Sequence, residues 1–323
     1  MFKKLLRIVL SVSLMALLLY FAFRKVEWQN FIDGIRSTDF TFVALSMCCG
    51  FAAFVLRGLR WKLLLQPLDP QIGFARTFDG VCIGNLANCA LPFAGEFARC
   101  GVVSTKKAGF DKTFGTIALE RLWDFISIVL IVVLAFLLKG DTVRNFLEDN
   151  VFRPMAEGAV RIWWLALALA ALLALAVWIA VRFRDSNRVC GKLCGLASGL
   201  GQGFISVIRM KKKGAFLLLT VLIWTMYWLM CVSISTGFPA AGGLTIGDTL
   251  FIMAVGNLAS VIPVPGGFGA YHYIIALALS GIYGLGWDNG IVFATLSHES
   301  QALVMIVSGI ACYVHRALTM RKK

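Results

Sequence analysis

The feature that most constrains this chain is a four-residue motif that occurs twice, each time in a hydrophobic segment interrupted by proline and glycine. The motif Gly-Asn-Leu-Ala covers residues 84–87 and 256–259, and breaks follow at Pro92–Gly95 and Pro263–Gly269. Matched, interrupted hydrophobic segments in two halves of a chain are typical of transporters built from internal repeats. The pattern predicts a repeated membrane architecture with a binding site at the breaks.

The composition agrees with a membrane protein. Of 323 residues, 59% are apolar, and the mean hydropathy is +0.81. A soluble domain averages about 45–50% apolar residues, whereas several runs here approach or exceed the ~18 uncharged residues of a spanning helix. We expect one all-α, polytopic membrane domain over residues 1–323, with repeat halves at about 1–140 and about 158–323.

Charge separates the loops into two groups. Lys and Arg number 31 against 17 Asp and Glu, a net charge of +14, and the basic residues cluster beside hydrophobic runs. The positive-inside rule accounts for this excess without nucleic acid. It places both termini and the loops 57–76, 100–112 and 182–213 in the cytoplasm. The outer loops are then 24–39, 139–160, 237–247 and 285–290.

Hydrophobic runs predict about six spanning helices, at residues 5–23, 40–63, 113–138, 161–181, 214–236 and 291–313. Each broken segment, 77–110 and 248–284, has arms of about 15 residues, against the ~20 needed to cross a bilayer. We therefore predict two re-entrant hairpins that enter from opposite faces, in inverted-topology repeats. Two tilted full spans per segment are the alternative.

The breaks are the first candidates for a site. Non-helical backbone at membrane depth is tolerated inside protein or beside a watery cavity, and a helix that restarts there directs free N–H groups toward an anion. Gly266 and Gly267 would let a lipid headgroup approach the backbone closely. The alternative is a plain kink. The predicted structural breaks are Pro92, Gly95, Pro263, Pro265 and Gly269.

Polar residues in the first half form a second candidate group. Asn85 and its counterpart Asn257 could hold a headgroup, or could only hydrogen-bond neighbouring helices. The ionisable candidates follow the first break or lie in the next helix, where we expect Arg121 to reach Asp124. Buried ionisable residues are costly and indicate function, or else a closed ion-pair network. They are Glu96, Arg99, Glu120, Arg121 and Asp124.

The second half has titratable residues instead. Aligning Asp111 with Asp288 places Arg121 opposite His298, which lies beside Glu299, and His272 follows the second break. A Ser297–His298–Glu299 hydrolase triad has poor geometry, because consecutive helical residues point in different directions.

The sequence motifs of common nucleotide-binding, metalloprotease and serine-hydrolase sites are missing. The chain has no Walker loop, HExxH or GxSxG motif, and no further ligand accompanies Cys190 and Cys194. We expect no catalytic residue, no metal and no cofactor.

Four short segments resemble the lysylphosphatidylglycerol synthase transmembrane-region family, the flippase-like membrane module of the multiple peptide resistance factor. They are Arg60-Trp61 with Leu63–Leu65, LPFAGEFAR at 91–99, LERLWD at 119–124 and PVPGGFGAYH at 263–272. The resemblance implies an inner-membrane bundle with re-entrant helices that binds, and in some members translocates, lipids with anionic or modified headgroups. Phe93 replaces a common basic residue of the family, His272 replaces a common Glu, and the aromatic-Arg pair that many members have near His298 is missing. No soluble aminoacyl-transferase domain accompanies the module in these residues, so we do not expect lysyl transfer.

We therefore expect a flippase-like lipid transporter or lipid-binding protein of the bacterial cytoplasmic membrane. Its partner would be an anionic phospholipid or a polyprenyl-phosphate-linked lipid. Two alternatives stay open: an intramembrane lipid transferase or phosphatase, and a non-transporting subunit of an envelope lipid or glycan assembly. A homo-oligomer and an envelope-biosynthesis partner also stay open.

Overall fold

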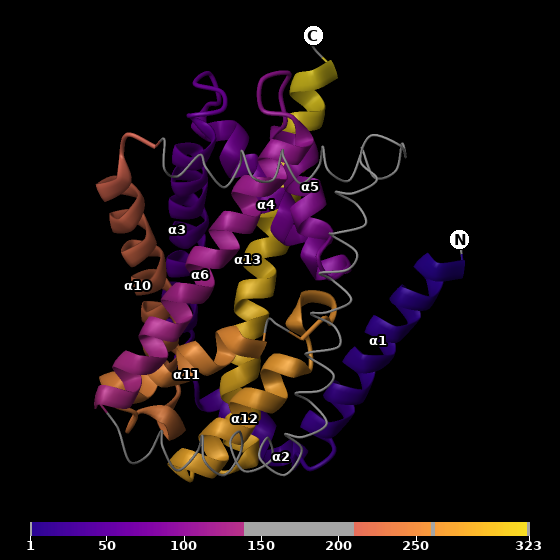
Figure 1. Cartoon of the computed structure of the whole chain (residues 1–323). Coiled ribbons are helices and arrows are strands. Elements are labelled where there is room, and N and C mark those ends of the chain that lie inside the picture. Colours follow the sequence, from indigo (N-terminus) through magenta and orange to yellow (C-terminus); the bar gives the residue numbers. More distant parts are fainter. Residues whose placement is uncertain (1, 139–209, 260–261, 322–323) are drawn as a thin grey trace, which may run out of the picture.

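The structure, a computed structural model, describes residues 2–138, 210–259 and 262–321, and all regular structure in these ranges is helical (Figure 1). Two 3-10 turns, η2 (Pro239–Ala241) and η4 (Pro265–Gly267), connect longer helices. The α-helices are α1 (Phe2–Phe23), α2 (Trp28–Ser37), α3 (Phe40–Leu65), α4 (Phe74–Ala90), α5 (Ala94–Val103), α6 (Phe110–Leu138), α10 (Lys213–Gly237), α11 (Ile246–Leu258), α12 (Ala270–Tyr283) and α13 (Trp287–Arg321).

Three helices are long and apolar enough to cross a membrane: α3, α10 and α13. They correspond to the predicted spans 40–63, 214–236 and 291–313. Helices α1 and α2 together form a fourth candidate, bent by 87° between them. The predicted span 113–138 is the helix α6, and the predicted span 161–181 lies outside the described residues. The membrane-helix prediction is confirmed, while the number of six spans stays a prediction.

Helix α2 was not predicted, because residues 24–39 were expected to form an outer loop. Phe31 and Ile35 lie one turn apart and pack against the hydrophobic core. Asn30, Asp33 and Arg36 are exposed. This spacing is that of a short amphipathic helix. Its apolar residues are too few and too widely spaced to form a continuous hydrophobic run.

Each broken segment forms a pair of helices joined by irregular backbone. Between α4 and α5, Phe93 has a φ of 63°, the only positive φ of a non-glycine residue in the described ranges. Between α11 and α12, Gly266, Gly267 and Gly269 have positive φ. Helix α11 begins at a capping box, in which Thr245 and Asp248 satisfy each other's backbone N–H.

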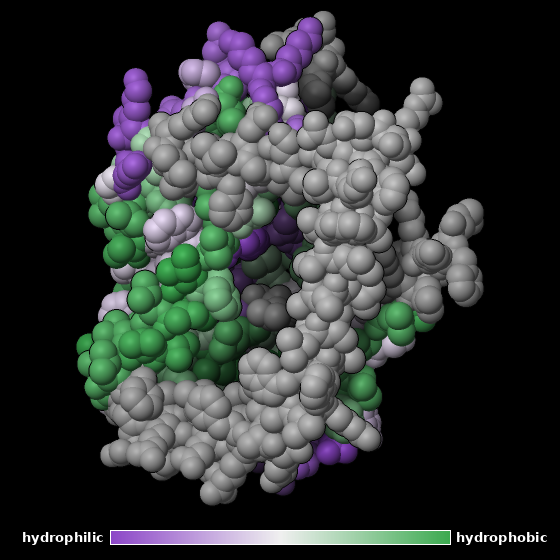
Figure 2. Space-filling view, viewed as in Figure 1, coloured by the Kyte–Doolittle hydropathy of each residue, from purple (hydrophilic) through white to green (hydrophobic). Residues whose placement is uncertain are grey.

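The two helix pairs lie toward opposite ends of the bundle, α4 and α5 above and α11 and α12 below in Figure 1. The connection between α3 and α4, the start of α10 and the C-terminus all lie at one end of the bundle. Helix α2 lies at the other end. Figure 2 shows an apolar band between hydrophilic ends. This arrangement agrees with the predicted grouping for the described loops. Which group faces the cytoplasm, and the re-entrant character of the hairpins, stay predictions.

The two hairpins close in the same way. The Gly84 Cα packs against the Arg99 side chain, and the Gly256 Cα packs against the Tyr271 ring. Arg99 and Tyr271 stand at the same offset from these glycines in the sequence. The first residue of each Gly-Asn-Leu-Ala motif is therefore the position where one arm of a hairpin passes closely over the other.

Glycine packing predicts how the first hairpin responds to an added methyl group. A Cβ at Gly95 would collide with the Gly84 carbonyl oxygen and the Asn88 amide, whereas a Cβ at Gly101, in the same helix α5, would meet open space. We expect Gly95→Ala to lower the free energy of unfolding by about 1–3 kcal/mol. Gly101→Ala should be neutral or stabilising by up to about 1 kcal/mol. Thermal unfolding of the two variants measures this, and equal effects would contradict the described closure.

Candidate functional site

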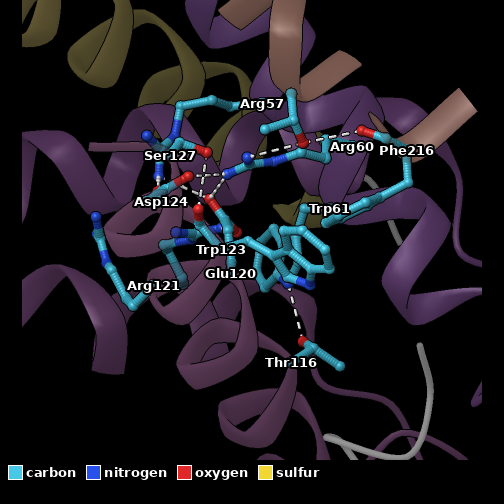
Figure 3. A network of polar contacts seen from close by, with 12 residues as sticks. Arg57, Arg60, Trp61, Thr116, Glu120, Arg121, Trp123, Asp124, Ser127 and Phe216 are labelled. Carbon is cyan, nitrogen blue, oxygen red and sulfur yellow. Dashed lines mark hydrogen bonds and ion pairs between the residues drawn. The ribbon is translucent and has the colours of Figure 1, made fainter. Parts of the chain in front are cut away.

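A buried ion cluster joins helices α3, α5 and α6 (Figure 3). The Glu120 carboxylate accepts from Arg57 Nη2 at 2.7 Å and from Arg99 Nη2 at 2.6 Å. The Asp124 carboxylate accepts from Arg60 Nη2 at 2.6 Å and from Arg57 Nη2 at 3.0 Å. Glu120 and Arg60 are fully buried. Charge-assisted hydrogen bonds of this length make burial of these charges tolerable.

Helical spacing explains why these residues meet. Glu120 and Asp124 are one turn apart on α6, and Arg57 and Arg60 are three apart on α3, so each pair projects from one face. A carboxylate row on one helix thus faces a guanidinium row on the other.

Helix α10 and Trp61 complete the surroundings of the arginines. Arg57 Nη1 donates to the Tyr227 hydroxyl at 3.0 Å, and Arg60 Nη1 donates to Thr220 Oγ1 at 3.3 Å. The Arg99 guanidinium lies 4.1 Å from the centre of the Trp61 ring, a cation–π distance. The two halves of the chain are therefore linked through this cluster.

The predicted pair of Arg121 with Asp124 is wrong. Arg121 Nη2 donates to Glu96 Oε1 of α5 at 2.6 Å, and Figure 3 shows the Arg121 side chain directed away from Asp124. The Asp124 carboxylate instead accepts hydrogen bonds from Arg57 and Arg60 of α3. Sequence reasoning missed Arg57 and Arg60 because basic residues near a helix end indicate a cytoplasmic boundary. Their spacing opposite Glu120 and Asp124 was the available signal.

The second half brings together the three titratable residues that the sequence singled out. Glu299 Oε1 of α13 lies 3.3 Å from His272 Nε2 of α12 and 3.3 Å from His298 Nδ1. His298 Nε2 lies 2.9 Å from the Gly266 carbonyl oxygen in η4. His272 is buried, and its Nδ1 has no hydrogen-bond partner in the described ranges. This group is named the His–Glu cluster below.

A hydrolase triad is not formed, as expected. The Ser297 hydroxyl lies 2.9 Å from the Tyr271 hydroxyl. Its hydrogen bond therefore goes to a tyrosine of α12, while His298 contacts Gly266 and Glu299.

The pairing of hairpin and following helix is repeated between the halves. With Asp111 aligned to Asp288, Glu120 corresponds to Ser297, and Arg99 corresponds to Tyr271 by its offset from the motif. Both pairs are in contact, the first as an ion pair and the second as a hydroxyl–hydroxyl hydrogen bond. The same geometric contact thus carries charge in one half and none in the other.

A second pair repeats in the same register. Glu96 corresponds to Phe268 and Arg121 to His298. Glu96 and Arg121 form an ion pair, whereas the Phe268 and His298 rings meet edge to face with centroids 4.9 Å apart. The contacts therefore support the internal repeat, and they show that its two halves have different chemistry.

A cavity of about 260 Å³ lies where the two hairpins meet the long helices. Figure 2 shows hydrophilic residues deep in a hollow of the apolar band. Its lining contains six of the predicted site residues: Asn85, Arg121, Asn257, Gly266, Gly267 and His298. Arg57, Tyr227, Ser297 and Gln301 add polar groups, and Met230, Met253, Met305 and Phe54 add apolar ones.

The remaining predicted residues lie outside this lining. Arg99, Glu120 and Asp124 belong to the ion cluster, Glu96 pairs with Arg121, and His272 and Glu299 lie beyond His298. Gly269 packs against the backbone of α1 at Met15 and Leu19. The second break therefore reaches the cavity through Gly266 and Gly267, whereas the first break, Pro92–Gly95, contributes no lining residue.

The ion cluster and the Glu96–Arg121 pair together have an excess of positive charge. Four guanidinium groups face three carboxylates. The guanidinium groups are those of Arg57, Arg60, Arg99 and Arg121, and the carboxylates are those of Glu96, Glu120 and Asp124. Because Arg57 and Arg121 line the cavity, the excess charge is presented to whatever enters it.

Comparison with known proteins gives a family match over most of the chain. The model of the lysylphosphatidylglycerol synthase transmembrane region matches residues 5–309. A UPF0104 membrane protein of Pyrococcus horikoshii is 29% identical over 142 residues, 42% of this chain and 41% of that protein. Glycosyltransferase AglD of Haloferax volcanii is 24% identical over 331 residues, 94% of this chain and 52% of that protein. The chain spans about half the length, or less, of these relatives, and no solved structure matches.

Burial predicts that two glutamates of this region differ in their contribution to stability. Glu120→Gln and Glu96→Gln each remove one charge at nearly constant volume. Glu120 is fully buried among arginines, while the Arg121 partner of Glu96 has 46% of its side chain exposed. We expect Glu120→Gln to cost about 3–5 kcal/mol and Glu96→Gln at most about 1 kcal/mol. Denaturant unfolding in detergent checks this, and equal costs would contradict the central role of Glu120.

Proposed function

Because the chain belongs to the lysylphosphatidylglycerol synthase transmembrane-region family, we propose that it is a flippase-like protein that binds an anionic lipid headgroup in its central cavity. The lipid is a phospholipid or a polyprenyl-phosphate-linked lipid. The observation that carries the proposal is the excess guanidinium group of the ion cluster, presented to the cavity by Arg57 and Arg121.

The accessible cation is Arg121. Arg57 is 9% exposed and already donates to Glu120, Asp124 and Tyr227. Arg121 has nearly half of its side chain exposed and one acidic partner, Glu96, within the described residues. A guanidinium group has five N–H donors, so Arg121 can keep Glu96 and still donate to a phosphate oxygen. Asn85 and Asn257 supply further donors and acceptors in the same cavity.

The size of the cavity limits what it holds. A cavity of about 260 Å³ is slightly smaller than the 300–1,000 Å³ of a typical small-molecule site. It fits a phosphate headgroup but no acyl or polyprenyl chains. The polar groups of Arg57, Asn85 and Arg121 in the lining support a headgroup that enters while its tails stay in the bilayer.

The arrangement of the hairpins supports movement of the lipid. Two broken helix pairs from opposite ends of the bundle converge on one cavity, an arrangement that alternating-access transporters use around a fixed site. Rocking of one half against the other would expose the cavity to each face in turn. The hairpin-to-helix contacts repeated in both halves supply the two rigid bodies that such rocking needs.

The similarity to glycosyltransferase AglD supports a second candidate, a membrane subunit that presents a lipid-linked substrate to an enzyme. The chain matches about half of that protein, so the relative contains substantial sequence beyond this region. Stable co-purification with a transferase, without lipid movement by the protein alone, would favour this role. Turnover of a polyprenyl phosphate by pure protein would favour an enzyme.

The proposal predicts a selective loss of anionic lipid when Arg121 is neutralised. Native mass spectrometry of the purified protein, titrated with phosphatidylglycerol and phosphatidylcholine, measures both affinities. Arg121→Gln should weaken phosphatidylglycerol binding about 10–100-fold, the value of one charge-assisted hydrogen bond, while Arg121→Lys should retain most of it. Phosphatidylcholine carries the same phosphate beside a choline cation, so its affinity should fall less than that of phosphatidylglycerol.

Arg36→Gln is the matched control, because Arg36 is an exposed arginine of α2 outside the cavity lining. It should leave both affinities unchanged. Equal loss of phosphatidylglycerol in the Arg36 and Arg121 variants would attribute binding to general surface charge. An unchanged affinity in folded Arg121→Gln would remove the cavity from the proposed function.

A further inference from the structure

We propose that His272, His298 and Glu299 form a binding site for a divalent transition-metal ion such as Zn²⁺. The three residues come from α12 and α13, and their ligand atoms lie within 4.8 Å of one another. Two imidazoles and a carboxylate are a donor set that binds zinc with an open fourth position. The inference concerns different residues from the arginines and does not depend on lipid binding.

The distances suit a tetrahedral ion. Zinc bonds of about 2.0–2.2 Å to nitrogen and oxygen place tetrahedral ligand atoms roughly 3.3–3.5 Å apart. Glu299 Oε1 lies 3.3 Å from His272 Nε2 and 3.3 Å from His298 Nδ1. Two of the three edges of the ligand triangle therefore already have the required length. The third, between the two nitrogens, is at most 4.8 Å and would shorten on binding.

The hydrogen bond of His298 orients its ligand atom. Nε2 lies 2.9 Å from the Gly266 carbonyl oxygen, and a carbonyl can only accept, so Nε2 carries the proton. In a neutral imidazole Nδ1 then carries a lone pair, and this lone pair faces the Glu299 carboxylate. Two acceptors in contact repel each other unless a cation lies between them. In such sites a metal-bound histidine usually donates a hydrogen bond from its other ring nitrogen to a carboxylate, a water or a backbone carbonyl, as His298 does here.

Charge favours a cation at the same place. Glu299 forms ion-pair contacts with only the two histidines within the described ranges, so its carboxylate has no permanent positive partner there. In the first half, the position that corresponds to His298 is the permanent cation Arg121. A bound metal would supply in the second half the positive charge that an arginine supplies in the first.

Access and position are compatible with exchange of the ion. Glu299 has 41% of its side chain exposed, whereas His272 has 2% exposed, so the site opens on the carboxylate side. His298 also lines the central cavity. A metal there would sit in the cavity wall, fixed on one side by the second break through Gly266.

Metal binding by the purified full chain tests the proposal. After removal of metals with a chelator, equilibrium dialysis against Zn²⁺ and elemental analysis give the stoichiometry and affinity. Visible absorption of the Co²⁺ form reports tetrahedral coordination. We expect one specific ion per chain. His298→Gln and Glu299→Gln should each weaken binding more than about 100-fold, because even outer-shell changes cost 10–100-fold.

The chain contains three histidines, and the third, His315, is exposed on the same helix α13. His315→Gln is therefore the matched control and should bind Zn²⁺ like the wild type. Size-exclusion chromatography verifies folding, and the half-exposed Glu299→Gln keeps the test valid if a histidine variant does not fold. Equal Zn²⁺ affinity in wild type, folded His298→Gln and folded Glu299→Gln would overturn the proposal, as would no binding at micromolar Zn²⁺.

Discussion

The contact on which this structure depends is the buried carboxylate of Glu120. It accepts from Arg57 of α3 and Arg99 of α5, and without these donors its burial would cost several kcal/mol. The arginines are equally dependent on it, since a buried guanidinium needs an acidic partner. Arg57 also donates to Tyr227 of α10, and Arg60, whose Nη2 lies 3.4 Å from Glu120 Oε1, donates to Thr220 of the same helix. One carboxylate therefore holds the first hairpin, the helix after it and α3 together.

This constraint also determines what the cavity offers. The ion cluster and the Glu96–Arg121 pair together contain one more guanidinium group than carboxylates, and Arg121 is the exposed arginine of this set. An anionic group therefore gains most on the side of the first hairpin. The second half repeats the contacts with uncharged or titratable residues, as Tyr271–Ser297 and His298 show. An inverted repeat with unequal chemistry can place a headgroup phosphate at one wall and a different ligand at the other. In the proposed function, the contacts repeated in both halves serve movement of the lipid, and the difference in their chemistry serves its recognition.

The sequence predicted those parts of the structure that local pattern controls. Hydrophobic runs indicated α3, α10 and α13, proline and glycine indicated both breaks, and the alignment of the halves brought His298 to the position of Arg121. It did not predict the partners of the charges. Arg57 and Arg60 resemble boundary residues until α6 is packed against α3. Arg121 can reach Asp124 on its own helix or Glu96 on α5, and the packing of α5 against α6 decides between the two partners. Such choices depend on tertiary packing, and the matched spacing of Arg57 and Arg60 with Glu120 and Asp124 was the one signal that the sequence offered for them.

The central claim is that the excess positive charge of the cluster holds a lipid phosphate in the cavity. The most direct measurement is a cryo-electron microscopy map of the full chain in nanodiscs that contain phosphatidylglycerol. The account predicts density for a phosphate within hydrogen-bonding distance of the Arg121 guanidinium, with acyl chains outside the cavity. A cavity filled by acyl chain, or anionic headgroups bound only at the basic ends of the bundle, would contradict it.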